Sequence, residues 1–295
     1  MRFANLDGRA TLVVADSSDP TDLHGGTARA VDIERASSGA LSSDPAVYVD
    51  LTNHTALCAI AERAVPGEWP VLDPATLGAP VPRPPKGLGV GLNYRTHAAE
   101  SGRELPTEPH LFGKTNNCVC GPFDHVIAPA GRHEIDFEAE VVIAFGRTCK
   151  GATEADAWSY IAGVMCGQDI SDRGEQFRVP IKQFTIAKSY DTFGPTGPVL
   201  VTPDELADRD ALELTGVVSG EVMQHANTSD LIFTVPALVV WLSRFMTFGP
   251  GDLVWTGTPG GVGEARSPQR FLVDGDVIET TVSGVGTMRN TVRVR

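Results

Sequence analysis

Two glutamates one residue apart, Glu138 and Glu140, and an aspartate about thirty positions later, Asp169, have the chemistry of a divalent-cation site. The segment 135–141 alternates apolar residues at odd positions with acids at even positions, which is the period of a β-strand. Residues i and i+2 of a strand share a face, whereas a helix would point the two glutamates to nearly opposite sides. Carboxylate oxygens suit Mg²⁺, Mn²⁺ or Ca²⁺, and a cation would relieve the repulsion among three like charges. A solvated acidic strand face is the alternative interpretation.

A second candidate group is His97 with Glu100. The two residues are three positions apart, so one helical turn would place them side by side. A carboxylate beside an imidazole fixes its tautomer and raises its basicity, which suits a general base. A surface pair without function is the alternative.

Asp169 comes after an apolar stretch, so it should lie where a strand ends. Three further polar residues that could bind a ligand follow it in the sequence. Arg173 and Gln176 could face one ligand from a short helix or form an exposed pair. Lys188 is a single lysine between apolar and turn residues, for which solvent exposure is the ordinary outcome. The glycine-rich segment 254–263 lacks the spacing of a phosphate-binding loop, so its glycines are expected to let the backbone approach a ligand closely.

Short strand-like runs between glycine and proline turns must position these residues. We expect strands at 10–15, 47–51, 87–91, 140–145 and 197–201. A capping pattern at 153–156 predicts a helix to about residue 160, and an early proline predicts another helix from about 234 to just before Gly249. Many strands and few helices indicate a β-rich α+β fold.

A proline cluster at 79–87 cannot be helix interior or central strand, so we place a domain boundary there. The expected division is a small N-terminal domain, 1–82, and a catalytic domain, 83–295.

The composition limits the kinds of binding partner and the compartment that we expect for the protein. A net charge of −13, with 24 Lys and Arg against 37 Asp and Glu, argues against nucleic acid and means that an anionic substrate needs a metal or local cations. The five scattered cysteines predict free thiols in a reducing compartment. Since no segment has the pattern of a signal peptide or a bilayer span, we expect a cytoplasmic protein without a membrane partner.

From about Gly87 onward, the order and spacing of these motifs resemble the fumarylacetoacetate hydrolase family, whereas the segment before residue 80 matches poorly. The motifs that carry the resemblance are Gly91-Leu92-Asn93-Tyr94 with His97 and Glu100, Leu111-Phe112-Gly113-Lys114, Asp136-Phe137-Glu138-Ala139-Glu140, Gln168-Asp169-Ile170-Ser171 with Arg173 and Gln176, Lys188-Ser189-Tyr190-Asp191, Gly194-Pro195-Thr196-Gly197-Pro198, Asn227-Thr228-Ser229-Asp230, Pro250-Gly251-Asp252 and Thr256-Gly257-Thr258-Pro259.

The resemblance implies a mixed β-roll catalytic domain, usually homodimeric, with Mg²⁺ or Mn²⁺ as the cofactor. It implies metal ligands at Glu138, Glu140 and Asp169. It also makes His97 and Glu100 a water-activating dyad in a lid over about 96–113. The residues that would grip a small anionic 2-oxo acid are Arg173, Gln176, Lys188 and Thr258.

The expected activity is hydrolytic cleavage of a carbon–carbon bond in an acylpyruvate-like 2,4-dioxo acid, with His97 as base and Lys188 helping to neutralise the substrate. The alternative is a decarboxylase, isomerase or tautomerase, or a hydratase or dehydratase, with the same pocket. Its substrates would be oxaloacetate, 2-hydroxyhepta-2,4-diene-1,7-dioate or a keto-deoxy sugar acid. A metal-stabilised binding protein without activity is a third possibility.

Overall fold

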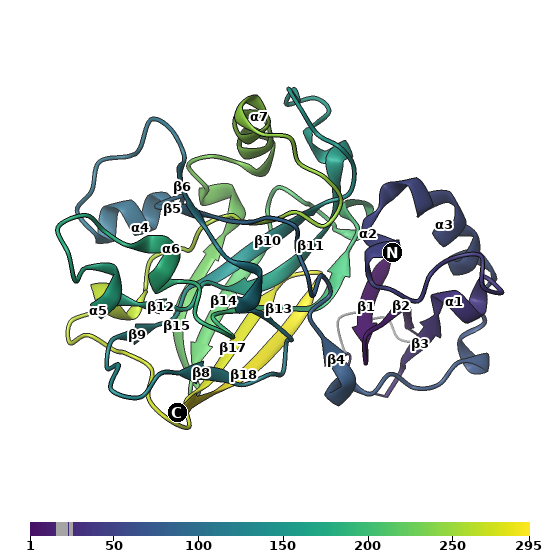
Figure 1. Ribbon diagram of the computed structural model, residues 1–295, viewed down its shortest axis with the longest axis horizontal. Helices are drawn as coiled ribbons and strands as arrows, with labels where there is room; N and C mark the ends of the chain where they lie inside the picture. The colour runs from purple at the N-terminus through teal and green to yellow at the C-terminus, as the bar shows by residue number, and fades with distance from the viewer. Residues whose placement is uncertain (16–22, 24–25) are drawn as a thin grey trace.

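A large mixed sheet runs through the computed structural model, which describes residues 1–15, 23 and 26–295 (Figure 1). Its eleven strands are β1 (Arg2–Leu6), β2 (Arg9–Ala15), β3 (Ala28–Asp32), β4 (Leu77–Gly78), β5 (Gly87–Gly91), β6 (His110–Gly113), β7 (Val119–Cys120), β10 (Ala139–Phe145), β11 (Ile161–Gln168), β13 (Gly194–Val201) and β16 (Leu253–Trp255). The main path is β3-β2-β1-β13-β11-β10-β16-β5-β6, with β4 on β1 and β7 on β13. The β16–β5 and β13–β7 pairs are parallel and the others are antiparallel.

A second sheet packs against one face of the first. Its five strands are, in order, β15 (Glu221–Asn227), β14 (Glu213–Val218), β17 (Val277–Val282), β18 (Gly286–Val294) and β8 (Val126–Ala128). Residues of β10, β11 and β13 share one apolar cluster with residues of β14, β17 and β18. A separate pair, β9 (Ile135–Asp136) and β12 (Ser171–Asp172), lies beside the ends of the main sheet. This β-rich α+β architecture confirms the predicted fold class.

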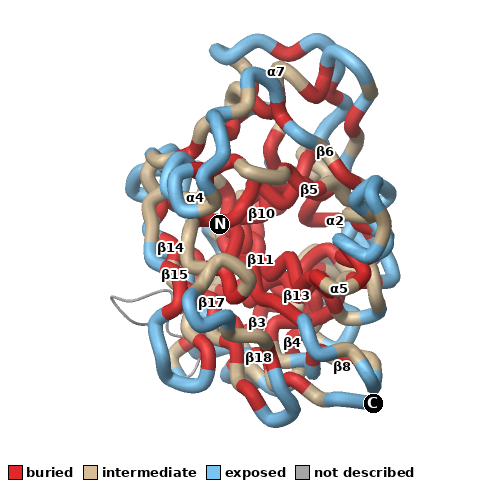
Figure 2. The backbone as a smooth tube through the Cα atoms, turned by 90° about the vertical axis from the view of Figure 1, so that its left-hand side faces the viewer, coloured by how far each residue is buried: buried red, intermediate tan, exposed pale blue. Residues whose placement is uncertain are grey.

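Strand β10 is buried on both faces, because apolar residues occupy its odd and even positions alike. Val141 and Ile143 belong to the cluster between the two sheets, whereas Val142 and Ala144 pack in a second cluster with residues of the N-terminal segment. In Figure 2 the central strands β10, β11 and β13 are buried along their whole length. The acids Glu138, Glu140 and Asp169 lie at or near the adjoining ends of β10 and β11, so the buried core fixes their positions.

Helices are short and lie at the periphery (Figure 1). They are α1 (Ile33–Ala36), α2 (Ala46–Val49), α3 (His54–Arg63), α4 (Arg95–Glu100), α5 (Arg173–Gln176), α6 (Phe184–Ala187) and α7 (Val235–Phe245), with 3₁₀ turns at Leu51–Asn53, Pro66–Glu68, Pro74–Thr76, Asn116–Cys118, Ala157–Tyr160, Pro203–Glu205, Thr228–Asp230 and Gly263–Ala265. Helix α7 begins as expected, since the Thr234 side chain accepts a hydrogen bond from the Ala237 N–H and a proline follows early. Among the described residues, no helix has the length and apolarity needed to cross a bilayer.

Two predicted elements are wrong. Residues 47–51 form the end of helix α2 and the start of a 3₁₀ turn instead of a strand. There the Tyr48 ring stacks on Phe3 at 5.1 Å and its hydroxyl donates to the Pro80 carbonyl oxygen, so tertiary contacts override the strand preference of the segment. The expected helix at 153–160 is only a 3₁₀ turn over Ala157–Tyr160, because β11 begins directly after it at Ile161. The Asp156 side chain does accept a hydrogen bond from the Thr153 N–H, as the capping pattern predicts.

The N-terminal strands extend the main sheet directly. Strand β1 pairs with β13, with Arg2 opposite Val201, and β2 and β3 continue the sheet outward. Helices α2 and α3 cover this end (Figure 1). The division into domains 1–82 and 83–295 stays a prediction.

Candidate metal and active site

The three predicted acids come together where β10 and β11 meet. The stretch 135–141 is not one continuous strand as predicted, because the chain leaves the β9 pair after Asp136 and enters the main sheet at Ala139. Glu138 lies at this junction and Glu140 lies inside β10. The N–H of Asp169, directly after β11, donates to the Glu138 carbonyl oxygen at 2.9 Å, which fixes Asp169 opposite that glutamate.

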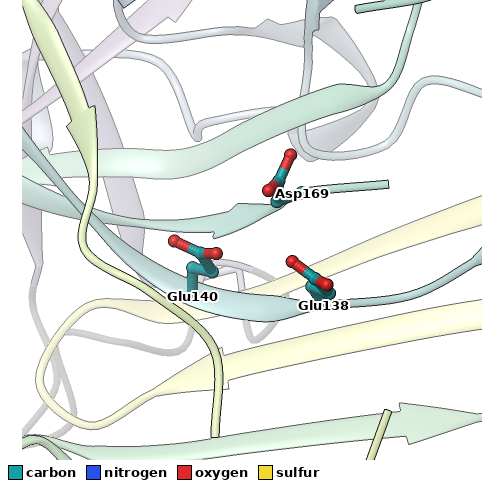
Figure 3. A group of neighbouring side chains, drawn as sticks. All are labelled: Glu138, Glu140 and Asp169. Atoms are coloured by element: carbon teal, nitrogen blue, oxygen red, sulfur yellow. The ribbon is translucent and has the colours of Figure 1, made fainter. Parts of the chain in front are cut away.

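The carboxylates of this acidic triad (Glu138, Glu140 and Asp169) point toward one another (Figure 3). One oxygen from each lies within 4.8 Å of the others. All three side chains are buried, with at most 6% of any residue exposed, so the acids are not a solvated strand face.

The two glutamates of the triad have pKa values shifted in opposite directions. Burial, followed by repulsion from Asp169 and Glu138, raises the pKa of Glu140 well above its ordinary value. Burial also opposes the charge on Glu138, but Lys188 and Arg173 outweigh it and lower the pKa of Glu138 to about 2. Glu140 is therefore the acid whose charge most needs a further cation.

Lys188 is buried, with 2% of the residue exposed, so the expected solvent exposure is wrong. Its Nζ donates to Glu138 Oε2 at 2.7 Å, to Asp169 Oδ2 at 2.6 Å and to the Ser171 hydroxyl at 2.7 Å. These bonds use all three N–H groups of the ammonium. Lys188 thus acts here as the counter-ion of two triad acids.

Lys114 is a second buried cation of the site, and the sequence analysis did not single it out. Its Nζ donates to Asp169 Oδ1 at 2.6 Å and to the carbonyl oxygens of Lys188 and Phe193. Burial disfavours the charge, but Asp169 outweighs burial and raises the pKa of Lys114. Lys114 stood in one of the family motifs, and no other sequence signal distinguished it from a surface lysine.

Arg173 reaches the triad from helix α5. Its Nη2 donates to Glu138, its Nε to Asp136 at 2.9 Å, and its Nη1 to the Gln176 side-chain oxygen at 2.9 Å. The expected short helix is present, and both Arg173 and Gln176 are buried. Because a guanidinium has five N–H donors and three are engaged, two remain for a ligand.

Asp136 is a further residue that the sequence analysis missed, although it belongs to the same alternation as Glu138. Its carboxylate accepts from Arg173 and also from the N–H groups of Gly263 and Glu264, at 2.7 and 3.0 Å. It is fully buried. Asp136 therefore ties the guanidinium to the glycine-rich segment on the other side of the site.

His97 and Glu100 lie on helix α4, three positions apart as predicted. The His97 Nδ1 is 3.9 Å from the Glu100 Oε2, which is too long for a hydrogen bond. Glu100 instead accepts from the Gly261 N–H at 2.7 Å, and the buried Nδ1 has no hydrogen-bond partner. Burial lowers the pKa of His97, although Glu138 and Glu100 oppose the shift, so the imidazole is neutral near pH 7.

The glycine-rich segment approaches the acids of the site. The Gly257 N–H donates to Glu140 Oε2 at 2.7 Å, and a Cβ at Gly257, where φ is +109°, would lie 2.6 Å from the Cβ of Asn93. This close approach requires glycine. Thr258 is buried in the same segment, and its hydroxyl donates to the Ala139 carbonyl oxygen at 2.9 Å while accepting from Gln224.

A cavity of about 270 Å³ opens onto this cluster. Its inner wall includes the predicted residues His97, Glu138, Arg173, Gln176, Lys188 and Thr258. Glu100, Glu140 and Asp169 are not among the residues that line the cavity.

The charge of the buried cluster fits a divalent cation. Four buried carboxylates, Asp136 and the acidic triad, face three buried cations, Lys114, Arg173 and Lys188, which leaves one net negative charge when all are ionised. Three convergent carboxylates are the ligands that Mg²⁺ and Mn²⁺ prefer. A divalent cation would convert the net charge to +1, which suits an anionic substrate.

Comparison with known proteins identifies the family of the chain. The family model "Fumarylacetoacetate (FAA) hydrolase C-terminal" matches residues 86–293. The chain belongs to the fumarylacetoacetate hydrolase family. This confirms the resemblance read from the motifs, and the chain is therefore an enzyme of this superfamily.

Three relatives illustrate the range of the family. The human mitochondrial oxaloacetate tautomerase FAHD2A is 39% identical over 239 residues, which cover 80% of this chain and 76% of that protein. A structure from Mycobacterium smegmatis with the provisional name HpcE is 40% identical, with a TM-score of 0.88 over 100% of this chain and 99% of that one. Maleylpyruvate hydrolase from Sphingobium sp. SYK-6, in complex with manganese(II) and pyruvate, is 31% identical, with a TM-score of 0.78 over 100% and 99% of the two chains.

Proposed function

We propose that this protein transfers a proton at the carbon next to the carbonyl group of a 2-oxo acid and so interconverts its keto and enol forms. The observation that carries the proposal is the neutral, partly buried imidazole of His97, which lines one cavity with Glu138, Arg173 and Lys188. A base beside a cation-binding cluster is what enolisation needs. The similarity to an oxaloacetate tautomerase supports this choice of reaction.

Each residue has a distinct role in the proposal. Glu138, Glu140 and Asp169 would hold Mg²⁺ or Mn²⁺, and the bound cation supplies Lewis-acid polarisation of the 2-oxo group. Lys114 and Lys188 hold the acids in place and offset their charge. His97 removes a proton from C3 and returns it to carbon or oxygen, which gives the keto or the enol form.

The substrate carboxylate is assigned to the wall formed by Arg173, Gln176 and Thr258. Arg173 has two N–H donors left on its outer nitrogens, which suit a carboxylate. The Gln176 amide group adds further donors, because its oxygen already accepts from Arg173. The Thr258 hydroxyl proton is engaged with Ala139, so Thr258 contributes to the shape of the wall and accepts hydrogen bonds.

Hydrolysis of an acylpyruvate-like 2,4-dioxo acid is the second candidate. The observation that favours it is the position of Glu100 on the same helix turn as His97, at 3.9 Å, where a small movement would form a water-activating dyad. We rank it second because Glu100 is engaged by Gly261 and His97 alone suffices for proton transfer. The similarity to a maleylpyruvate hydrolase supports this alternative.

The test is to incubate the protein and Mg²⁺ or Mn²⁺ with a panel of 2-oxo and 2,4-dioxo acids. Enol absorbance and deuterium exchange at C3 report tautomerisation, and mass analysis of the products reports cleavage. We expect faster keto–enol interconversion with wild-type protein and a rate about 10²–10⁴-fold lower with His97→Ala. Two product acids without prior exchange would favour hydrolysis, and no turnover of any acid would refute both functions.

A homodimer is the assembly that the family resemblance implies, and we propose it for this protein. Light scattering after gel filtration measures the mass directly. A monomer at all concentrations would contradict the proposal.

A further inference from the structure

One motif of the family resemblance, Asn227-Thr228-Ser229-Asp230, contributes no residue to the cavity lining. It forms the 3₁₀ turn Thr228–Asp230 between β15 and α7. The Asn227 side chain accepts from the Ser229 N–H at 2.9 Å, and the Leu212 N–H donates to the Thr228 hydroxyl at 2.8 Å. These bonds shape and anchor the turn at its first three residues, which leaves the Asp230 carboxylate for another segment.

Asp230 caps the helix that carries His97. Its Oδ2 accepts from the Thr96 N–H at 3.1 Å and from the Thr96 hydroxyl at 2.9 Å. Thr96 lies in the first turn of α4, where N–H groups have no partner within the helix. Tyr94, which precedes the helix, gives no side-chain cap, and the first turn has no acidic residue of its own. Asp230 therefore supplies the cap and the favourable negative charge from 134 positions away.

The same turn also holds the start of α4 through backbone groups. The Arg95 Nη1 donates to the carbonyl oxygens of Asp230 and Leu231 at 3.1 and 2.7 Å. The Ile232 N–H donates to the Asn93 carbonyl oxygen at 2.8 Å. The segment 230–232 is thus attached to three successive parts of the chain that leads into α4.

The position of His97 depends on how α4 is held. The helix has six residues, and helices shorter than about 12 residues are marginal in isolation. Its far end is tied where Glu100 accepts from the Gly261 N–H at 2.7 Å. His97 follows Thr96 directly, and its buried Nδ1 has no hydrogen-bond partner among the described residues. Because no bond at this nitrogen orients the imidazole, the backbone of α4 sets its direction into the cavity.

We propose that Asp230 is a positioning residue for the reaction: its carboxylate caps α4 and thereby directs the His97 imidazole into the cavity. This role rests on the proposed function, because it needs His97 to be the base. Asp230 is not among the residues that line the cavity, so it acts through Thr96 and not on the substrate. An amide oxygen accepts the same two hydrogen bonds, so the acceptor at this place is the essential feature and the charge is secondary.

The kinetic test compares Asp230→Ala, Asp230→Asn and Thr96→Val, each alone, and Asp230→Ala also in the His97→Ala background. The control is Ser229→Ala, which changes an exposed side chain of the same turn and keeps its N–H bond to Asn227. Deuterium exchange at C3 of oxaloacetate with Mg²⁺ gives kcat and KM for each protein. Thr96→Val removes one of the two bonds to Asp230 and keeps the other, so it serves as the milder variant where Asp230→Ala fails to fold.

We expect Asp230→Ala to lower kcat about 10²-fold, the usual cost of a displacement of about 1 Å at a reacting group, while KM changes less than about twofold. Thr96→Val should lower kcat about fivefold, the equivalent of one ordinary hydrogen bond. Asp230→Asn and the Ser229 control should stay near wild type. In the His97→Ala background Asp230→Ala should cost nothing more, because a residue that acts through the imidazole has no effect without it. A further loss in that background, or equal losses for Asp230→Asn and Asp230→Ala, would overturn the inference.

Histidine-selective NMR follows the imidazole without turnover. The His97 signal, identified by its absence in His97→Ala, should shift in Asp230→Ala and in Thr96→Val and keep its wild-type position in Asp230→Asn and Ser229→Ala. An unshifted His97 signal in Asp230→Ala, or in Thr96→Val where that variant alone folds, would overturn the inference and leave the proposed function standing. Failure of wild-type protein to exchange the C3 proton would refute the proposed function, and the NMR comparison would then still decide whether Asp230 positions His97.

Discussion

Replacing Lys114 by methionine should destabilise the protein strongly, and a divalent cation should restore part of the loss. The Nζ of Lys114 is fully buried against Asp169 and two carbonyl oxygens, so the variant leaves a buried carboxylate short of a partner. Breaking a buried ion pair costs about 3–5 kcal/mol of unfolding free energy. At about 2–4 °C per kcal/mol for chains of this size, the melting temperature should fall by roughly 10 °C.

The net charge of the buried cluster predicts how Mg²⁺ affects the stability of this variant. Without Lys114 the inner cluster carries −2 instead of −1. Two unit charges roughly 5 Å apart interact by about 3 kcal/mol at an effective dielectric constant near 20, so the added negative charge attracts a divalent cation by about 6 kcal/mol. Mg²⁺ should therefore stabilise the variant more than the wild-type protein.

The assay is thermal unfolding followed by circular dichroism, with excess EDTA and with saturating Mg²⁺. Lys150→Met is the matched control, because Lys150 is exposed and, among the described residues, its ammonium group donates one hydrogen bond, to the Arg244 carbonyl oxygen. A Lys114 variant that unfolds like the Lys150 control, or that gains no more from Mg²⁺ than wild-type protein, would refute the reasoning.

Three further predictions concern the reaction. His97→Ala should lower kcat by about 10²–10⁴-fold, which is the usual contribution of a general base. The Mg²⁺-induced rise in melting temperature should persist in this variant. Loss of that rise would show that His97 supports the metal site instead. The acid limb of the kcat/KM profile should lie below pH 6.5, because burial lowers the pKa of His97 and the neutral base survives to lower pH; a limb above 6.5 would contradict this. Asp136→Asn should raise KM about tenfold with a smaller effect on kcat, since it frees the Arg173 guanidinium from one of its charged partners; an unchanged KM in steady-state kinetics would remove Asp136 from the binding machinery.

Local periodicity predicted part of the centre of the molecule, although the chain leaves β9 after Asp136 and enters β10 only at Ala139. The alternation around Glu138 and Glu140 placed both acids on one face, and the apolar stretch before Asp169 placed that residue at a strand end. The start of α7 followed from the cap at Thr234. These features depend on neighbours in sequence, which a single chain displays directly.

Features that depend on distant partners were not predictable in this way. The burial of Lys188 follows from acids 19 and 50 positions earlier in the sequence, and no local pattern announces it. The helix at Tyr48 depends on Phe3 and on the Pro80 carbonyl oxygen. The Glu100 carboxylate, expected to orient His97, is held by Gly261, which is 161 positions away.

The most direct test of the central claim is a crystal structure of the protein grown with Mn²⁺ and measured at the manganese absorption edge. We predict one strong anomalous peak between the carboxylates of Glu138, Glu140 and Asp169, within ordinary Mn–oxygen distance of each. The absence of a peak at these three carboxylates at full Mn²⁺ saturation, or manganese bound elsewhere in the chain, would contradict it.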